Sequence, residues 1–407
     1  MTYVITLAID NFGDRGRPLP NGMRPEQCVN DDFAEDWPRL DYPRLFYYLK
    51  ESGIDVVVKQ TEEADGEAWY PITVGWFDFT LDYFDLINPT ALARNMKIVF
   101  LYHEADNPEH INDRLAELAE LHGHDNIAFI SGNSAADQYR FCHYWPELEY
   151  MYRRSVDFKQ ASTTHFKRRS KHFTGLCRID KLWRKIFMSN LWKKGLHHNG
   201  YFSYCQEFLG EQDDWAGVPL LNEFISEREP EFTKFIQAGP FFVDELSSRE
   251  RNDYAVLAEN FYHDSYFNIV LETFIDVDGS KGQFITEKTF KPILNNQPFI
   301  CVAEHNHMRH LRELGYETFR SLWSEEYDAI EDTQQRFEAV MKLSEELAGM
   351  RLDDLHELYV KSVPILEHNR NKLENDVTHR LHDLVDKIMS KPSRYTSVQS
   401  DLHHFDH

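Results

Sequence analysis

Residues 267–300 have the sequence FNIVLETFIDVDGSKGQFITEKTFKPILNNQPFI, and this stretch decides the fold. Its first apolar run belongs to a strand that we expect over 265–273. A short helix is predicted over 286–296, because Thr286 is a favourable N-cap residue. A buried strand is predicted over 297–303. A strand, a helix and a second strand in succession predict a parallel βαβ unit.

The same alternation extends outward in both directions along the chain. Continuous apolar runs predict strands, and apolar residues on one helical face, closed by a glycine, predict helices. We expect further strands over 3–9, 54–58, 97–102, 126–131 and 171–177, and further helices over 42–53, 108–123, 178–195, 308–315 and most of 333–390. This pattern is typical of an α/β protein with parallel sheets.

Composition excludes several classes of protein. Apolar residues make up 42% and aromatic residues 14% of the 407 positions, which argues against disorder. No apolar run approaches the roughly 18 residues of a membrane span, and the start, MTYVITLAIDNFGD, does not resemble a signal peptide. The five cysteines form no CxxC pair, so neither a disulfide framework nor a zinc knuckle is expected. We therefore expect a cytoplasmic protein (in the host cytoplasm if it is viral) with no membrane partner.

The formal charge of −24 argues against a nucleic-acid partner, but it is unevenly distributed. Residues 1–150 carry −16, residues 151–195 carry +11 and residues 196–407 carry −19. The basic segment, 151–195, contains the polar stretch QASTTHFKRRSKH, which is typical of a linker. We therefore expect domains over 1–160 and 161–385, followed by a flexible tail over 386–407.

The basic segment has two interpretations. It is either a solvated loop that offsets its acidic neighbours, or a site for a polyanion such as a phosphate or a nucleic-acid backbone. Its position at a domain junction favours the second interpretation, because ligand clefts often lie between domains. Arg168, Arg169 and Lys171 are the candidates for a DNA contact.

The TEK sequence at 286–288 indicates an anion site. Thr286 can cap the predicted helix, and the N-terminal amides of that helix together with Lys288 can hold a phosphate. Glu287 is placed to accept a ribose or sugar hydroxyl. A capping motif with a surface salt bridge would also explain these residues.

This stretch resembles the donor-binding segment of family-10 glycosyltransferases, the fucosyltransferase family, and in particular enzymes of the kind found in phages and viruses. That family has a FEN strand, a Y-[IV]-T-E-K helix start and a G-x-[VP]-P-V strand. By this resemblance, Glu272 matches the acid of the first strand, and Thr286, Glu287 and Lys288 match T-E-K. All four are then expected to bind the donor. The last element is QPFI at 297–300 here, without the preceding glycine.

Residues 171–204 resemble the opening of that family's C-terminal domain, with K-K-F-x-x-[FV]-x-x-S-N followed by R-x-x-[FL]-x-x-x-L. The resemblance implies that Arg184 binds the donor diphosphate, with Arg178 and Lys181 as nearby alternatives. A solvent-facing helix residue is the other interpretation of Arg184. The S-N pair of the family is not evident in this chain.

Residues 97–108, KIVFLYHEADNP, resemble a family strand that ends in E-S-P and carries the general base. Glu104 then takes that role, and Asp106 is its rival. An inverting sugar transfer needs one carboxylate to remove the proton of the acceptor hydroxyl. A glutamate at the carboxyl end of a parallel strand lies where such sheets bind ligands. A plain loop carboxylate is the alternative.

The resemblance implies the GT-B fold: two Rossmann-like domains that face a cleft, with a helical C-terminal tail. It also implies an inverting transfer from a UDP- or GDP-sugar, with the donor on the C-terminal domain. Cationic side chains and a helix N-terminus can hold the diphosphate, so no cofactor is expected to be required. No metal site is expected, because DVDG at 276–279 lacks the ligand spacing of an EF-hand.

The acceptor that we favour is the hydroxymethyl group of 5-hydroxymethylcytosine in double-stranded DNA. Aromatic residues interleave the basic segment, which suits a duplex backbone and an extruded base. A glycan acceptor and a non-catalytic nucleotide-sugar-binding module are the alternatives. Asp10 and Arg15, in the loop after the first strand, are candidate acceptor contacts. Asn133 is another, although a helix cap explains it equally well.

Overall fold

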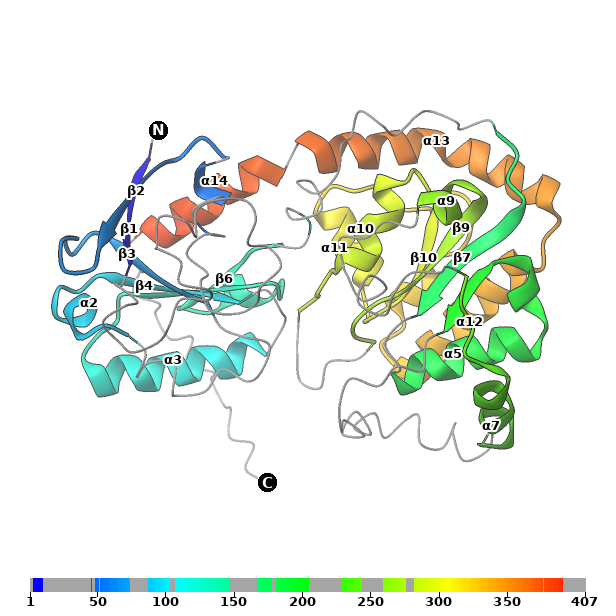
Figure 1. Ribbon diagram of the computed structural model, residues 1–407, viewed down its shortest axis with the longest axis horizontal. Helices are drawn as coiled ribbons and strands as arrows, with labels where there is room; N and C mark the ends of the chain where they lie inside the picture. The colour runs from blue at the N-terminus through cyan, green and yellow to red at the C-terminus, as the bar shows by residue number, and fades with distance from the viewer. Residues whose placement is uncertain are drawn as a thin grey trace, which may run out of the picture. The chain divides into compact units, whose positions relative to one another are not determined.

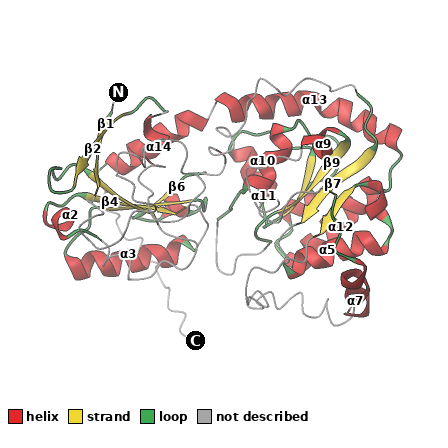
Figure 2. Ribbon diagram, viewed as in Figure 1, coloured by secondary structure: helices red, strands yellow, loops and turns green. Residues whose placement is uncertain are grey.

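A computed structural model shows that the chain forms two compact units (Figure 1). It describes residues 3–9, 45, 48–50, 52–73, 87–102, 107–146, 149, 167–177, 181–204, 229–243, 259–275, 282–375 and 377–390. The first unit contains the described residues up to Trp145 and those from Thr378 onward, and the second contains those from Pro146 to Val377. Each unit combines strands with helices (Figure 2), so the α/β class expected from the sequence is confirmed.

Among its described residues, the first unit has a six-stranded parallel sheet in the order β2-β1-β3-β4-β5-β6. The strands are β1 (Val4–Ile9), β2 (Asp55–Gln60), β3 (Trp69–Thr73), β4 (Lys97–Tyr102), β5 (Ile127–Ser131) and β6 (Cys142–Tyr144). The helices are α2 (Pro89–Ala93), α3 (Pro108–His122), the 3-10 turn η5 (Ala136–Gln138) and α14 (Val377–Met389). Helices α3 and α14 lie on opposite faces of the sheet (Figure 1).

Local sequence explains the central elements of this unit. Strand β4 is buried from Ile98 onward and β5 along its whole length, as expected for parallel strands covered on both faces. Helix α3 begins where the side chain of Asn107 accepts a hydrogen bond from the Glu109 amide, and it ends at Gly123, whose φ of 59° is left-handed. The strand predicted over 97–102 and the glycine cap at Gly123 are therefore confirmed.

Among its described residues, the second unit has a four-stranded parallel sheet in the order β10-β9-β7-β8. The strands are β7 (Lys171–Cys177), β8 (Tyr201–Tyr204), β9 (Ser265–Leu271) and β10 (Phe299–Val302). The helices and 3-10 turns are α5 (Leu182–Lys193), η6 (Leu196–Asn199), α7 (Glu229–Ala238), α9 (Glu259–His263), α10 (Glu287–Leu294), α11 (His307–Glu313), η8 (Glu326–Ala329), α12 (Thr333–Ala348) and α13 (Leu352–Asn375). The predicted βαβ unit is present as β9, α10 and β10, with β9 and β10 parallel and fully buried.

The winding of the chain reverses once between the described strands of each sheet. In the first unit, β2 lies on one side of β1, and the later strands lie on the other side. In the second unit, β8 lies on one side of β7, whereas β9 and β10 lie on the other. Open α/β sheets bind ligands outside the carboxyl ends of their strands at such a reversal. In the second unit this point is the carboxyl end of β7 and β9.

The C-terminal boundary differs from the one expected. Helix α14 belongs to the first unit, where the His382 ring nitrogen Nε2 lies 2.7 Å from the carbonyl of Ser52. The ammonium of Lys97 donates to the carbonyl of Ile388 at 2.6 Å. Residues 386–389 are thus the last turn of a packed helix rather than the start of a tail, and 391–407 lie outside the described residues. The division between the two compact units falls between Trp145 and Pro146.

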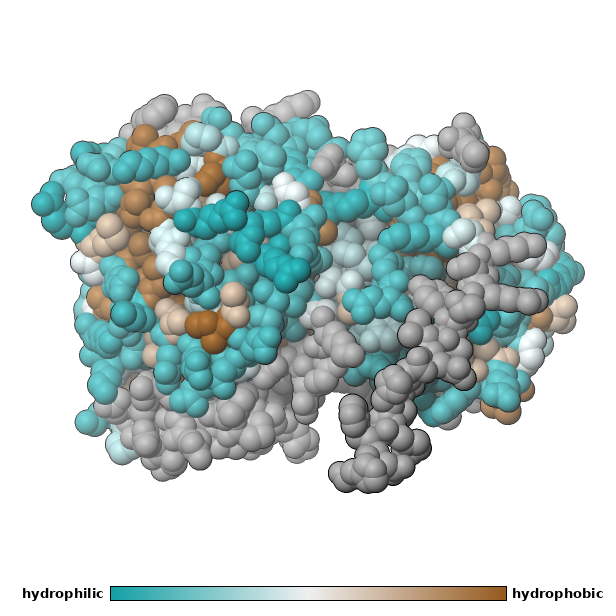
Figure 3. Space-filling view, turned by 180° about the vertical axis from the view of Figure 1, so that it is seen from behind, coloured by the Kyte–Doolittle hydropathy of each residue, from teal (hydrophilic) through white to brown (hydrophobic). Residues whose placement is uncertain are grey.

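The surface of the described residues is largely hydrophilic on the face shown in Figure 3, with smaller hydrophobic areas between the charged groups. Individual apolar side chains such as Leu121 and Phe242 are exposed. Within the described part of the chain, no helix has the length and apolar character that crossing a membrane requires.

Candidate functional site

Charged side chains gather at the carboxyl ends of β7 and β9. Glu272 directly follows β9, Lys181 and Arg184 lie at the start of α5, and Glu287 and Lys288 form the start of α10. These elements are brought together because α5 follows β7 and α10 follows β9 in neighbouring parallel strands. The structure therefore collects the described donor-binding candidates at the edge that the strand order marks as a ligand site.

Glu272 is the buried centre of this cluster, with 1% of its surface exposed. Its carboxylate accepts hydrogen bonds from the amides of Thr273 and Thr286 at 3.1 and 3.3 Å. It also accepts bonds from the hydroxyls of Thr286 and Thr289 at 2.5 and 2.6 Å. These donors suit an ionised carboxylate. Glu272 thus holds the start of α10 in place, a different role from the direct donor contact expected from the sequence.

The first turn of α10 contains both the cap and the salt bridge that the sequence suggested. The Thr286 hydroxyl accepts a hydrogen bond from the Lys288 amide at 3.3 Å. The Lys288 ammonium lies 2.7 Å from the Glu287 carboxylate and 3.1 Å from the Thr273 hydroxyl. Burial raises the pKa of Glu287, but Lys288 and Lys291 outweigh it and lower the pKa to about 2. The pair is therefore ionised, and 27% of the Lys288 side chain is exposed.

The start of α5 contributes two more cations. Arg184 is buried, and its guanidinium donates to the carbonyls of Leu271 and Glu272 at 3.2 and 2.5 Å. The ammonium of Lys181 donates to the carbonyl of Thr273 at 2.7 Å. Helix α5 begins after Lys181, whose side chain makes no capping bond to the first turn of the helix. The solvent-facing interpretation of Arg184 is wrong.

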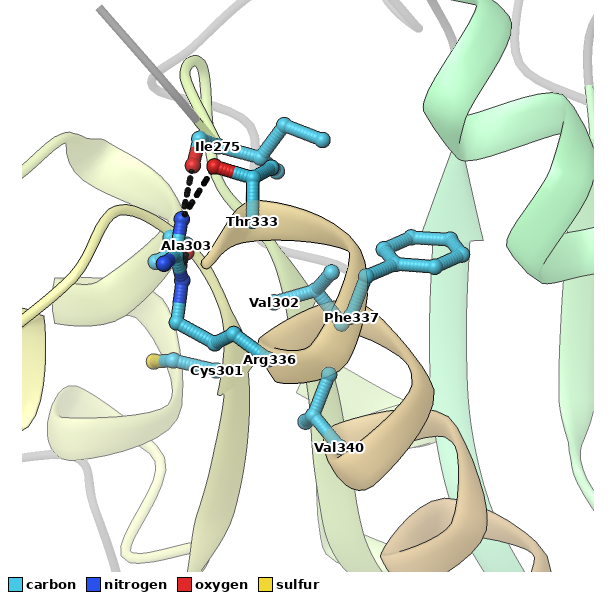
Figure 4. A pocket seen from close by; sticks show the side chains of 8 residues that line it. All are labelled: Ile275, Cys301, Val302, Ala303, Thr333, Arg336, Phe337 and Val340. Carbon is cyan, nitrogen blue, oxygen red and sulfur yellow. Dashed lines mark hydrogen bonds between the residues drawn. The ribbon is translucent and has the colours of Figure 1, made fainter. Parts of the chain in front are cut away.

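Arg336 fixes the next part of the same loop. Its buried guanidinium donates to the carbonyls of Ile275 and Ala303 at 2.5 and 3.2 Å and to the Thr333 hydroxyl at 3.2 Å (Figure 4). A cavity of about 10 Å³ lies beside it. The cavity is lined by Ile275, Cys301, Val302, Ala303, Thr333, Arg336, Phe337 and Val340. Such a volume holds about one water molecule, so this cavity is not a ligand pocket.

Several predicted site residues lie outside the described residues. Glu104 and Asp106, the candidate bases, follow β4 in the chain. Arg178 follows β7, Asp10 follows β1, and Arg15 lies further along the same loop. Their roles remain predictions from the sequence.

Asn133 has a local structural role after β5. Its side-chain oxygen accepts a hydrogen bond from the Ala135 amide at 2.9 Å, and its own amide donates to the Ser131 hydroxyl at 3.1 Å. The residue is fully buried. Asn133 thus closes a local turn before η5, whose N-cap is Ala135, and its role as an acceptor contact stays a prediction.

Arg169 is part of the interior of the second unit. Its guanidinium donates to the carbonyls of Tyr262 and Ser265 at 2.8 and 2.5 Å and to the hydroxyl of Tyr359. It also lies 3.8 Å from the centre of the Tyr359 ring. Only 6% of the residue is exposed. Contrary to the expectation from the sequence, its charge is therefore not available to a DNA backbone.

Arg168 and Lys171 lie at the opposite end of the sheet from the charged cluster. Arg168 is exposed and pairs with Asp353, and the Lys171 ammonium donates to the carbonyl of His198 at 3.1 Å. Both adjoin the amino end of β7, a strand of seven residues, whereas the cluster adjoins its carboxyl end. At about 3.3 Å per residue, the strand separates the two groups by roughly 20 Å. The basic segment therefore places positive charge at both ends of strand β7.

Two residues of the cluster, Thr289 and His307, were not among the residues predicted from the sequence. Thr289 lies three positions after Thr286, so a helical turn brings both hydroxyls to Glu272. His307 begins α11, which follows the carboxyl end of β10, and its ring nitrogen Nε2 lies 3.3 Å from the Thr289 hydroxyl. The spacing of the threonines was visible in the sequence, but the contact with His307 was not.

Comparisons with protein-family models, with curated proteins and with solved structures gave no match. Among the described residues, no group of three or more histidine, cysteine, aspartate or glutamate side chains is arranged to hold a metal ion.

Proposed function

We propose that this chain is an inverting glycosyltransferase of the GT-B type that transfers a sugar from a UDP- or GDP-sugar to an acceptor hydroxyl. The observation that carries the proposal is the cluster at the winding reversal of the second unit. There, Lys181, Arg184 and Lys288 converge on the loop that follows β9. Open parallel sheets of this kind place their ligands at that edge.

In this proposal, the start of α5 and the three cations hold the donor diphosphate. The N-terminus of a helix such as α5 carries a partial positive charge, which favours an anion. The ammonium groups of Lys181 and Lys288 approach Thr273 from two helices, and a diphosphate beside Thr273 would be in reach of both. Arg184 adds a positive charge whose position is fixed by its hydrogen bonds to the carbonyls of Leu271 and Glu272. Such groups stabilise the charge that develops as the nucleoside diphosphate leaves.

The transfer itself also requires a base. The acceptor oxygen attacks the anomeric carbon, the bond from that carbon to the diphosphate oxygen breaks, and the proton of the acceptor passes to a carboxylate. We assign that carboxylate to Glu104, or to its rival Asp106, because both follow β4 in the chain and parallel sheets bind ligands at the carboxyl ends of their strands.

For the acceptor, we propose the hydroxymethyl group of 5-hydroxymethylcytosine in double-stranded DNA. The support is the charge of +11 over 151–195 within an otherwise acidic chain. Of its described members, Lys167 and Arg168 are exposed near the amino end of β7, roughly 20 Å along that strand from the donor cluster, so a bound duplex would have to extend over this distance. A glycan acceptor is the alternative outcome of the test below.

The test is a matrix of UDP- and GDP-sugars against hydroxymethylcytosine DNA, hydroxymethyluracil DNA and simple glycans, read as the mass gained by the acceptor. Lys181→Ala and Lys288→Ala should each weaken donor binding about tenfold, because each removes a cation from the diphosphate. Lys342→Ala is the matched control, since Lys342 is 78% exposed and pairs with Glu346 on α12. Donor binding without transfer to any acceptor would favour a non-catalytic module, and absence of donor binding would refute the proposal.

The DNA acceptor has a test of its own. Affinity for DNA should fall steeply with salt concentration, and Lys167→Glu and Arg168→Glu should weaken binding and flatten the salt dependence. Binding that is indifferent to salt, or transfer to glycans alone, would refute DNA as the acceptor while leaving the donor chemistry intact.

A further inference from the structure

A buried chain of polar groups connects α11 to the first turn of α10. The His307 ring nitrogen Nε2 lies 3.3 Å from the hydroxyl of Thr289, and that hydroxyl lies 2.6 Å from the Glu272 carboxylate. The carboxylate then accepts the hydroxyl of Thr286 at 2.5 Å. Thr289 is fully buried, and His307 and Glu272 are each 1% exposed. Polar groups buried to this degree hold their geometry because each unmade hydrogen bond is costly.

The direction of the hydrogens in this chain follows from the chemistry of its members. An ionised carboxylate only accepts, so the single hydroxyl hydrogen of Thr289 points to Glu272. The hydroxyl oxygen then accepts from His307, which places a hydrogen on Nε2 of that ring. Burial lowers the pKa of His307, with Glu272 and Asp328 opposing, which favours the neutral form of the ring. Its other nitrogen, Nδ1, is buried without a hydrogen-bond partner among the described residues, which suits an unprotonated atom better than a charged N–H.

The other end of this series of hydrogen bonds reaches the half-buried ammonium of Lys288. The Thr286 hydroxyl, held by Glu272, lies 3.3 Å from the Lys288 amide and 3.4 Å from the Lys288 ammonium. Both oxygens of the carboxylate are used, because Thr289 binds one and the Thr286 hydroxyl binds the other. If Thr289 lost its hydroxyl, three of the four hydrogen bonds to the Glu272 carboxylate would remain, and Oε1 would keep only the bond from the Thr286 amide. The carboxylate that orients Thr286 would therefore be held less rigidly.

We propose that Thr289 is a positioning residue for the donor site, an inference that rests on the function proposed above. Its hydroxyl bridges His307 and Glu272 and so fixes the carboxylate that orients Thr286 and Lys288. Thr289 is fully buried, so in this proposal it does not contact the nucleotide sugar directly. It acts through the geometry of the first turn of α10.

The test compares Thr289→Val with Thr289→Ser. Valine keeps the shape of the side chain and removes the hydroxyl, whereas serine keeps the hydroxyl. Thr289→Val should weaken binding of UDP- or GDP-sugar about tenfold by calorimetry, which corresponds to about 1.4 kcal/mol. Thr289→Ser should restore affinity to within about twofold of the unmodified protein.

Thr318→Val is the matched control. The Thr318 hydroxyl donates to the buried carboxylate of Glu325 at 2.7 Å, which is the same kind of bond in the same unit. This variant should lose thermal stability as Thr289→Val does and still bind the donor normally. Equal affinity of Thr289→Val and the unmodified protein would overturn the proposal, and so would equal weakening by Thr318→Val.

A second measurement needs no nucleotide. Hydrogen exchange of the amides at 286–290 should be faster in Thr289→Val than in the unmodified protein and unchanged in Thr318→Val. Unchanged hydrogen exchange at 286–290 in Thr289→Val would refute the positioning role even if the protein bound no nucleotide sugar. Failure of the unmodified protein to bind any donor, with the exchange result as expected, would instead refute the proposed function and leave the hydrogen-bonded chain established.

Discussion

Replacing Glu272 by glutamine should destabilise the second unit by about 3 kcal/mol. Glutamine keeps the shape of the side chain but turns one acceptor oxygen into a donor NH₂. If the NH₂ group takes the place of Oε1, it faces the Thr286 amide, which is left without an acceptor at a cost of about 1–3 kcal/mol. The bonds from Thr273 and from the Thr286 hydroxyl then lose their charge assistance, at roughly 0.5–1 kcal/mol each.

Hydrogen exchange is the suitable assay because it reports each unit separately, whereas a single unfolding midpoint would mix both. The free energy of exchange should fall by about 3 kcal/mol for the amides of β9 and α10 and stay constant for those of β4 and β5. Glu313→Gln is the matched control. Glu313 is 55% exposed and pairs with Arg309 on α11, so its loss should change stability by less than about 0.5 kcal/mol.

The reasoning would be refuted by a Glu272→Gln variant whose β9 amides exchange within about 1 kcal/mol of the unmodified protein. That result would mean that the carboxylate is not ionised and saturated with donors as its contacts indicate. An equal loss in Glu313→Gln would also refute it, because the effect would then follow any loss of negative charge in this unit.

Other predictions concern the base, the basic segment and acid stability. Of Glu104→Gln and Asp106→Asn, the variant that removes the base should transfer sugar about 10²–10⁴-fold more slowly at unchanged donor affinity, and full activity of both would contradict the assignment. Arg169→Met should lower the free energy of urea unfolding of the second unit by about 2–4 kcal/mol, because buried carbonyls lose their hydrogen-bond donor. Arg168→Ala, at an exposed residue, should change that free energy by less than about 0.5 kcal/mol. Similar losses in both variants would count against this distinction. The pKa of Glu287 is lowered from 4.5 to about 2, so its contribution is complete above pH 4.5 and is lost as the pH falls towards 2. Glu287→Gln should therefore flatten the stability curve between these values, and an unchanged acid limb would argue against the ion pair.

Sequence patterns predicted most central elements because the information for them is local. The run at 97–102 contains enough consecutive apolar residues to be a parallel strand, and the structure places β4 there. Where the pattern was weak, the element was missed. Strand β3 lies between β1 and β4 although it contains Pro71, which lacks an amide hydrogen and argues against a central strand. Strand β8 has only four residues, too few for a periodic pattern.

Local contacts in the charged cluster were predicted in part for the same reason. Thr286 as an N-cap and the pairing of Glu287 with Lys288 follow from residues that are adjacent in the chain. The interpretations of Arg169 and Glu272 depended on distant partners. A charged residue gives no local sign of whether it faces solvent or meets carbonyls and hydroxyls from other elements.

The sequence by itself determined the α/β class, the βαβ unit over 265–303 and the capped turn at 286–288, because strand and helix formation depend on neighbours in the chain. Only the tertiary structure decided which unit receives α14, which end of β7 each part of the basic segment adjoins, and that Glu272 is enclosed by Thr286 and Thr289. The physical reason is that burial and charge pairing depend on which surfaces meet. Residues far apart in the chain decide that, and their local patterns do not record it.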